Sequence, residues 1–429
     1  VVEAAGFVGG EAGGGGVAGR VAGGGDGAGS RWRSGRRCWY AAPVAATDFV
    51  MEELQRLERE GLLRVPDYAA DLAALEERLL ARGRRVIDAC SNDYLGFGAR
   101  DVSRETRSAP APPAGARASR LIFGTTHDHD RLEQELATWL GYPATLLFSS
   151  GYAANLGVLA ALCGPGDLIV SDALNHASIV DGARLSRASI AVVPHRDLAA
   201  FDRALAAPAR RRFVVTEAYF SMDGDAPDLP ALASLVTRHD ACWILDEAHS
   251  LGVFGPEGRG LAAATGVMPH LLVGTLGKAF GLHGAFVAAA ASVRTLLWNR
   301  ARSFVYSTAT SPLLARLASA RLSAVRAAAP ARRHLLALAE AAHRRCADAG
   351  LVAPTNIPGP ILALPLGQPD RARAIAQALY DDGFLVRAIR PPTVPPGTAR
   401  LRIVLHADHS ASDVDELLNL TFRAAATLR

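Results

Sequence analysis

Lysine is almost absent from this 429-residue chain, in which 46 side chains are basic and all but one of them are arginine. The exception is Lys278. Arginine replaces lysine wherever only a positive charge is needed, but its guanidinium stays protonated and cannot attack a carbonyl as a free amine. A single lysine in such a background is therefore a candidate for amine chemistry, although on the count alone a surface lysine is an equally good interpretation.

Other features are scarce as well, and their scarcity excludes whole classes of protein. No apolar run is long enough to span a membrane, since glycine, proline or charge interrupts each one. The net charge is only +4 and no basic stripe is interleaved with aromatics, which argues against nucleic-acid binding. The five cysteines lie far apart without a CxxC pair, which favours a reducing, cytoplasmic location over a disulfide-stapled secreted protein.

Composition divides the chain into four predicted parts. The first thirty residues contain thirteen glycines and no core pattern, and an arginine cluster follows them. Residues 1–50 are therefore predicted to be disordered or a non-native N-terminal extension. The other predicted parts are an N-terminal helix and arm (51–95), whose helix begins with MEELQRLEREGLL at Met51, a large α/β domain (96–335) and a smaller α+β C-terminal domain (336–429).

Short β-branched runs alternate with Ala/Leu-rich helical segments, which predicts a mainly parallel sheet with helices on both faces. The runs that indicate buried strands are ATLLFSS, DLIVSD, IAVVPH, RFVVTEA, CWILDEA and LLVGTL. After about residue 340 the pattern changes, with strands predicted at PILALPL, FLVRAIR and ARLRIVL and helices at 331–349, 370–382 and 411–428. This change marks the smaller C-terminal domain.

Two residues that follow successive predicted strands carry the strongest chemical signal. Asp246 ends the strand in WILDEAH and Lys278 follows VGTL, so both lie at the carboxyl edge, where open α/β sheets bind ligands. A lysine amine can bond the aldehyde of pyridoxal phosphate (PLP), and a carboxylate can keep the pyridine nitrogen of that cofactor protonated. Asp-x-x-His alone also resembles a metal or hydrolase fragment, and Asp246 alone can be a helix cap. Together with the lysine, the aspartate predicts a PLP site.

Further candidates follow other predicted strands. In SSGYAANLG, Gly151 ends a strand and opens a helix, and N–H groups at a helix N-terminus can cradle a phosphate. Thr275 can add a hydroxyl there. His176, in DALNHASIVDG, is placed to stack on the pyridine ring, and His249 is placed to donate to the phenolic oxygen of the cofactor.

Eight collinear motifs between about Met51 and Arg429 resemble those of the α-oxoamine synthases, PLP enzymes that condense an amino acid with an acyl thioester. They are SNDYLGFG, SSGYAANLG, LNHASIVDG, TEAYFSMDGD, ILDEAHSLGVFGPEGRG, GTLGKAFG, FVYSTATSP and IRPPTVPPGTARLRI. The resemblance implies an aspartate-aminotransferase-type (PLP fold type I) large PLP-binding domain and a homodimer with its active sites at the subunit interface. The last motif is most similar to the biotin-biosynthesis branch, which condenses L-alanine with pimeloyl-CoA or a pimeloyl-carrier protein and releases CoA and CO2.

The same resemblance assigns roles to individual positions. It implies that Lys278 forms the Schiff base, that Asp246 contacts the pyridine nitrogen and that His176 stacks on the ring. The residues expected to complete the cofactor site are Gly151, Tyr152, Ser221, His249 and Thr275, of which His249 also counts as catalytic. The residues expected to bind substrate are Arg64, Asn92, Arg390 and Thr393, with Arg390 on the amino-acid carboxylate and Asn92 assisting it. Ser307 or Thr308 is expected to reach the phosphate held by the partner subunit.

Two segments depart from the pattern of the family. ETRSAPAPPAGARASRLIFGTTHDHD replaces a shorter Gly/Ser stretch near the expected acyl chain, which leaves chain length open, and DEAHSLGVFG is closer to other branches. Another synthase that uses glycine or serine therefore stays an alternative, as does a non-catalytic partner subunit. His127 and His129 resemble a metal pair, but the polarity of a solvated loop explains them equally well, so no metal is expected.

Overall fold

The computed structural model describes residues 48–63, 69–81, 83–100, 112–352, 355 and 357–427. The chain divides into two units, Val1–Leu63 and Arg64–Arg429. In the first unit, helix α1 (Asp48–Arg59) contains the predicted helical run, and Arg56 pairs with Glu53 and Glu60 along its surface. Residues 1–47, which make up most of the predicted extension, lie outside the described residues.

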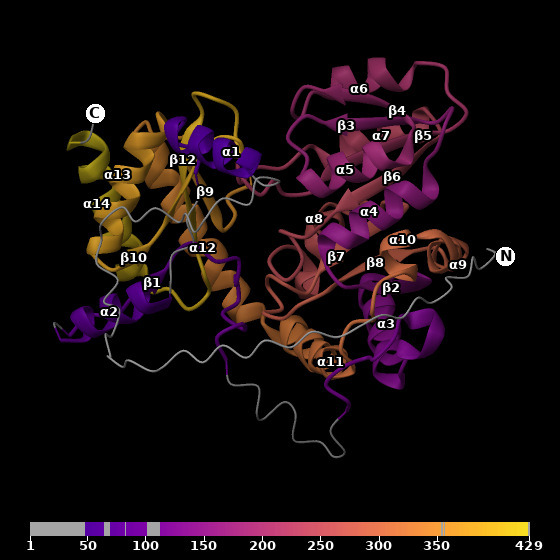
Figure 1. Ribbon diagram of the computed structural model, residues 1–429, viewed down its shortest axis with the longest axis horizontal. Coiled ribbons are helices and arrows are strands. Elements are labelled where there is room, and N and C mark those ends of the chain that lie inside the picture. The colour runs from indigo at the N-terminus through magenta and orange to yellow at the C-terminus, as the bar shows by residue number, and fades with distance from the viewer. Residues whose placement is uncertain are drawn as a thin grey trace, which may run out of the picture. The chain divides into compact units, whose positions relative to one another are not determined.

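The second unit contains a seven-stranded sheet with the strand order β2-β8-β7-β6-β5-β3-β4 (Figure 1). Its strands are β2 (Ala144–Phe148), β3 (Leu168–Asp172), β4 (Ser189–Val193), β5 (Arg212–Glu217), β6 (Ala241–Asp246), β7 (Leu271–Thr275) and β8 (Ala285–Ala289). All neighbours pair in parallel except β8, which is antiparallel to both β2 and β7. The prediction of a mainly parallel sheet is confirmed. Strand β8 was not predicted, because the alanines of AFVAA have little β propensity.

Helices cover both faces of this sheet because its strands are apolar on both sides. In β2, Leu147 faces one core, whereas Leu146 and Phe148 face the other. The first face is covered by α3 (His127–Leu140), α6 (Leu198–Leu205), α7 (Leu229–Arg238) and α11 (Pro312–Ala327), and the second by α4 (Gly151–Leu162), α5 (Ala177–Ser186), α9 (Ala291–Arg300) and α10 (Arg302–Val305). Shorter helices are η3 (Arg120–Gly124), η4 (Pro256–Gly258) and α8 (Gly260–Thr265).

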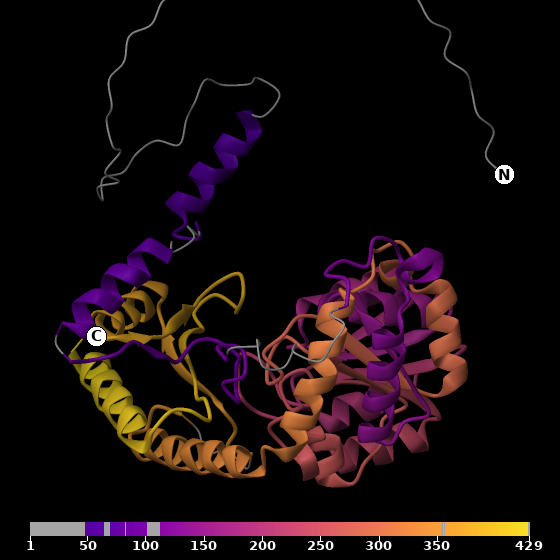
Figure 2. The same cartoon turned by 90° about the horizontal axis from the view of Figure 1, so that it is seen from below.

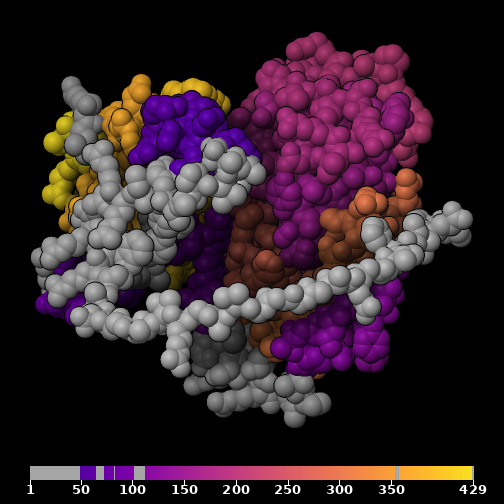
Figure 3. All heavy atoms as spheres, viewed as in Figure 1, coloured from indigo at the N-terminus to yellow at the C-terminus, as the bar shows by residue number. Residues whose placement is uncertain are grey.

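The C-terminal elements form a smaller α+β layer around a three-stranded antiparallel sheet with the order β11-β12-β9 (Figure 2). Its strands are β9 (Ile361–Gly367), β11 (Arg387–Ile389) and β12 (Ala399–Val404), and its helices are α12 (Ala329–Asp348), α13 (Pro369–Asp381) and α14 (Ala411–Thr427). The predicted domain boundary after residue 335 falls inside α12. In Figure 3 the C-terminal elements, orange to yellow, gather at the left and the magenta strand–helix segments at the right.

The N-terminal arm returns to these C-terminal elements. After α2 (Ala69–Leu80), strand β1 (Ile87–Asp88) pairs in parallel with β10 (Phe384–Leu385). His409 then contacts the carbonyl of Asp88 at 2.8 Å, which fixes the arm shortly before Asn92. Among the described helices, none is both long and apolar enough to cross a membrane.

Candidate active site

The site is built at the carboxyl edge of the parallel strands. Strand β6 ends on Asp246 and β7 ends on Thr275, with Lys278 three residues further on. The last residue of β5, Glu217, lies directly opposite Asp246 in the β5–β6 register. Because parallel strands end at the same edge, residues from three separate sequence motifs meet there.

Hydrogen bonds hold the Asp246 carboxylate in place. Its Oδ2 accepts from Asn155 Nδ2 at 2.7 Å and its Oδ1 accepts from the backbone N–H of Ala248 at 2.8 Å. Asn155 also donates to Ser178 Oγ at 3.0 Å, so its amide is fixed as well. Each carboxylate oxygen keeps a second lone pair, and one of these can accept a hydrogen bond from the N–H of a pyridinium ring.

Lys278 lies among charged groups of both signs. Burial lowers the pKa of its amine, the carboxylates of Asp246 and Glu217 raise it, and the positive charge of Arg402 lowers it again; the net effect is a pKa below the ordinary lysine value. A larger fraction of the amine is therefore unprotonated near neutral pH than in an ordinary lysine. An unprotonated amine is the form that attacks a carbonyl carbon or takes up a proton.

Glu217 is a site residue that the sequence reasoning did not single out. Burial, and then the neighbouring Asp246, raise the pKa of Glu217 to about 8, although Lys278 and backbone donors oppose them. One of its oxygens accepts from the backbone N–H of His176 at 2.7 Å. Its position at the end of β5 was the available signal, because every parallel strand that ends at this edge delivers a residue to it. Asn155 was also missed, and the signal for it was a lone amide in the otherwise apolar helix α4.

His176 is fixed by its backbone and by one ring nitrogen. It is the N-cap of α5, and its Nδ1 lies 2.7 Å from Ser178 Oγ and accepts from the Ser178 backbone N–H at 3.2 Å. The side chain is exposed, and the Tyr152 ring lies edge-on to it with centroids 6.4 Å apart. An anchored imidazole with an open face suits a planar ring stacked on it.

His249 is buried and hydrogen-bonded to Tyr94. Burial, and then the charges of Lys278 and Arg402, hold the pKa of His249 well below its ordinary value, so the ring is neutral. Its Nδ1 lies 2.6 Å from the Tyr94 hydroxyl, whereas that hydroxyl lies 3.4 Å from Asn92 Oδ1. We assign the Tyr94 hydrogen to the shorter contact, which leaves the ring hydrogen on Nε2, free to donate.

The N-terminus of α4 and the end of β7 meet where a phosphate is expected. Helix α4 begins at Gly151, and a Cβ built there would have no atom within 4 Å, so the space beside these first N–H groups is open. Thr275 Oγ1 lies 3.2 Å from the carbonyl of Gly284, and a Cβ on Gly284 would lie 3.5 Å from the carbonyl of Phe148. Gly284 thus lies between Thr275 and the end of β2. The open space, the free N–H groups and the held carboxylate fit PLP.

The structure describes three of the four predicted substrate residues, Asn92, Arg390 and Thr393. Arg64 lies outside the described residues. Arg390 is half-buried directly after β11, and the backbone N–H of the exposed Thr393 donates to its carbonyl at 3.1 Å. Asn92 Oδ1 accepts from Arg402 Nη2 at 2.8 Å, and Ser221 accepts from Arg402 Nε at 2.6 Å through its carbonyl. Asn92 and Ser221 are thus joined by Arg402, a residue that the sequence reasoning did not single out.

Arg402 is a cation inside an apolar strand. Its side chain in β12 is 6 % exposed, and its charge reaches both Lys278 and His249. Buried arginines are rare unless they are paired or bind an anion. The signal in the sequence was the strand ARLRIV, in which Arg400 and Arg402 share one face because strand side chains alternate.

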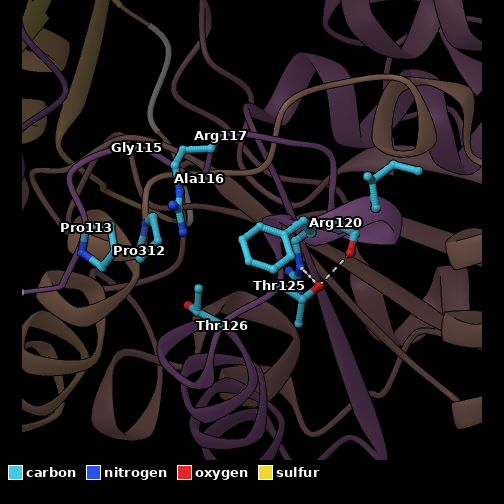
Figure 4. A pocket seen from close by; sticks show the side chains of 10 residues that line it. Pro113, Gly115, Ala116, Arg117, Arg120, Thr125, Thr126 and Pro312 are labelled. Atoms are coloured by element: carbon cyan, nitrogen blue, oxygen red, sulfur yellow. Dashed lines mark hydrogen bonds between the residues drawn. The ribbon is translucent and has the colours of Figure 1, made fainter.

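A cavity of about 290 Å³ is lined by a different set of residues (Figure 4). Its lining includes Pro113, Arg117, Arg120, Phe123, Thr126 and Pro312, and none of the predicted site residues. Arg120 is anchored there by Glu133 at 2.9 Å and by Thr125 at 3.1 Å. This is the segment that departs from the pattern of the family, and the residues that carry the cofactor chemistry lie elsewhere.

His127 and His129, which resemble a metal pair in the sequence, open helix α3 and do not lie on a solvated loop. His129 is buried, its Nδ1 contacts the Thr126 hydroxyl at 2.9 Å, and its Nε2 contacts the Thr310 carbonyl at 2.7 Å. Both nitrogens are therefore engaged in fixing the start of α3. Within the described residues one other cluster of metal-ligand type occurs, His406, Asp408 and His409, and His409 uses both ring nitrogens for backbone contacts.

Comparisons with known proteins identify the family of the chain. The sequence pattern of class I and II aminotransferases matches residues 84–420. A curated relative, the 8-amino-7-oxononanoate synthase of Anaeromyxobacter dehalogenans, is 45% identical over 378 residues, which cover 87% of this chain and 94% of that protein.

Solved structures give the same result for the fold. Serine palmitoyltransferase from S. paucimobilis, in a form with a bound PLP–myriocin aldimine, superimposes with a TM-score of 0.78 at 28% identity and covers 90% of this chain and 98% of its own. The 8-amino-7-oxononanoate synthase of Francisella tularensis gives a TM-score of 0.68 at 27% identity over 79% of this chain and 97% of its own. The predicted fold type and the predicted cofactor, PLP, are confirmed.

Proposed function

The chain belongs to the α-oxoamine synthases within the class I and II aminotransferase family, and on that premise we propose that it condenses L-alanine with a pimeloyl thioester to 8-amino-7-oxononanoate. The acyl donor is pimeloyl-CoA or a pimeloyl-carrier protein, and the other products are the free thiol and CO2. This is a step of biotin biosynthesis. The single observation that carries the proposal is the 45% identity to a synthase of that name over nearly its whole length.

PLP supplies an aldehyde that bonds an amine and a protonated ring that withdraws electrons from it. In the proposed site Lys278 is the amine that holds the cofactor and later moves the α-proton, because its lowered pKa favours the unprotonated form. Asp246 holds the ring nitrogen in its charged form, since it is a fixed carboxylate. His176 orients the ring by stacking, and His249 donates a hydrogen bond from Nε2 to the phenolic oxygen of the cofactor.

The amino-acid carboxylate needs a cation close to Lys278. The resemblance to the family points to Arg390, whereas the contacts of the described residues support Arg402, which is buried and held by Asn92 and Ser221. We propose that Arg402 makes the primary contact with this carboxylate. Arg390, in the turn after β11, makes a secondary contact. Thr393 and Arg64 stay proposed substrate contacts.

The remaining cofactor contacts complete the proposed site. Gly151 and Tyr152 offer N–H groups and Thr275 a hydroxyl to the phosphate, and Ser221 lies on the phenolic side with His249.

A homodimer is proposed as the active form. Ile122 and Tyr306 are 81% and 73% exposed, which supports their burial against a second copy beside Ser307 and Thr308. The scattered free cysteines favour the cytoplasm.

A panel of amino acids against acyl-CoA esters, followed by thiol release, tests the proposed substrates. We expect the highest kcat/KM for L-alanine with pimeloyl-CoA. Serine with a long-chain acyl-CoA is the main competitor, because the serine palmitoyltransferase fold superimposes well. Preference for serine or glycine would transfer the chain to another branch of the family. No thiol release with any pair, together with no PLP absorbance, would favour the non-catalytic partner subunit.

A further inference from the structure

A histidine outside the motifs of the site joins two of its turns. His195 lies two residues beyond β4, the edge strand that pairs with β3. Its Nδ1 lies 2.9 Å from Asp172 Oδ1, and its Nε2 lies 3.1 Å from Asp225 Oδ2. Asp172 is the last residue of β3, and Asp225 belongs to the turn after β5, so one ring spans two loops of the chain.

The first of these loops carries His176. The Asp172 carboxylate accepts from the backbone N–H of Leu174 at 2.8 Å and from that of Arg196 at 2.8 Å. Its side chain is 1% exposed, so it is fixed from several sides. Because Leu174 precedes His176 by only two residues, the position of Asp172 determines how the N-cap histidine of α5 enters the site.

The second loop, residues 220–225, carries Ser221. The Phe220 N–H donates to the Asp225 carbonyl at 2.8 Å and its carbonyl accepts from Gly224, which closes the turn. Gly224 has φ +66° and a Cβ there would overlap the carbonyl of Ile361, so no other residue fits. The Phe220 ring packs edge-on against His195, with centroids 4.4 Å apart.

Strand β12 holds the other side of this turn. Arg400 pairs with Asp223, and Arg402 donates to the Ser221 carbonyl at 2.6 Å. His195 therefore contacts this turn on the side opposite to Arg402, the arginine that we propose for the substrate carboxylate. If the turn shifts, the Ser221 carbonyl moves, and the direction of the Arg402 guanidinium moves with it.

We infer that His195 is a positioning residue, which ties the His176 turn to the Ser221 turn and thereby keeps Arg402 aimed at the amino-acid carboxylate. The inference rests on the proposed function for its substrate. Both ring nitrogens face carboxylate oxygens, which accept only, so both contacts are hydrogen bonds only when the ring carries two protons. The ring must therefore be an imidazolium for the two turns to be joined.

The surroundings of the ring favour that charged form. Burial alone lowers the pKa of His195, but the hydrogen bonds to Asp172 and Asp225 outweigh it and raise the pKa to about 9. Among the described residues, the charged groups around it are these two carboxylates and Arg196, whose Nη1 lies 2.8 Å from Asp225. Since the folded-state pKa exceeds the ordinary 6.5, the stabilisation is complete below 6.5 and is lost as the pH rises through about 9.

The test compares His195→Gln with a matched control, His239→Gln. His239 lies 2.6 Å from Asp202 and is 17% exposed, against 21% for His195, but this pair lies between the surface helices α6 and α7. In the PLP-loaded protein, His195→Gln should raise the KM for alanine about tenfold while kcat stays within about twofold. The control should change neither. An unchanged KM in His195→Gln would overturn the inference.

A second variant protects the test against a folding defect. His195→Arg keeps a planar cation that can donate to both carboxylates at any pH. Its KM should stay flat between about pH 7 and about pH 10, where that of the wild type should rise. A KM that rises equally in both proteins would contradict the role of the His195 proton.

Two further measurements need no substrate, so their failure is separate from a failure of the proposed function. The NMR titration of histidine ring carbons should give a midpoint near 9 for the signal that His195→Gln removes. A midpoint near 6.5 would refute the proposal that a charged His195 joins the two turns. Urea unfolding should show a loss of stability in that pH window for the wild type and not for His195→Gln. Equal losses in both would also refute it.

Discussion

The cofactor side and the substrate side of the site differ in how the chain forms them. The cofactor side consists of the ends of parallel strands, so Glu217, Asp246 and Lys278 meet because their strands are neighbours in one sheet. The substrate side joins Asn92 of the N-terminal arm to Arg402 of β12, residues that are 310 positions apart. Sheet topology thus positions the first set, whereas packing of the arm against the C-terminal elements positions the second. Variants on the two sides should fail in different ways.

The largest effect is expected on the cofactor side, from Lys278→Arg. The variant keeps the charge but loses the amine, because a guanidinium stays protonated. The fold should persist, and turnover should drop on the order of a thousandfold or more, together with the absorbance of the bound cofactor near the visible edge. Thiol release and an absorbance spectrum check this. Turnover comparable to that of the wild type would remove Lys278 from the mechanism.

The second effect separates charge at Asp246 from mere shape. Asp246→Asn keeps a hydrogen bond but removes the charge that holds the ring nitrogen protonated, so PLP should still bind while loss of the alanine α-hydrogen slows at least about a hundredfold, roughly 3 kcal/mol of barrier. Exchange with deuterated water, followed by NMR, isolates this step.

Glu217→Gln is the matched control for this comparison. Glu217 lies opposite Asp246, and burial raises its pKa to about 8, so it carries less negative charge at neutral pH than an ordinary glutamate. Replacing it with an amide should therefore slow exchange by less than about tenfold. If Glu217→Gln slowed the exchange more than Asp246→Asn, the two carboxyl groups would have exchanged roles.

The third effect is expected on the substrate side and decides between two arginines. Arg402→Gln should raise the KM for alanine by about 10- to 100-fold, as the loss of a charge-assisted hydrogen bond predicts, and Arg390→Gln should raise it less. Arg402→Lys, which retains the charge, is the control for misfolding of β12. A KM that responds to Arg390→Gln but to neither Arg402 variant would assign the carboxylate contact to Arg390, as the family resemblance implies.

The smallest effect is expected from removal of the N-terminal residues. A chain that starts at Met51 should form the same dimer and turn over alanine within about twofold of the full chain, because residues 1–50 contain no core pattern. Size-exclusion chromatography with light scattering, followed by the thiol assay, checks this. Loss of the dimer on truncation would make these residues part of the structure.

The sequence predicted the two sides of the site to different extents, for physical reasons. Period, β-branched runs and turn residues specify strands locally, so six strands of the large sheet could be read directly, together with Asp246 and Thr275 at the ends of two of them. Strand β8 was missed because its alanines favour helix over strand. Arg402, Tyr94 and His195 were missed because their importance lies in partners far away in the sequence, such as Asp172 and Asp225 for His195.

The central claim is that Lys278, the only lysine, holds PLP at the carboxyl edge of the sheet. Borohydride reduction of the purified protein, followed by intact-mass analysis and peptide mapping, tests it most directly, because reduction makes the bond between amine and cofactor permanent. We expect one phosphopyridoxyl group per chain, on the peptide TLGKAFG. An unmodified Lys278 in protein that contains PLP, or a cofactor group bound only to the N-terminal amine, would contradict the account.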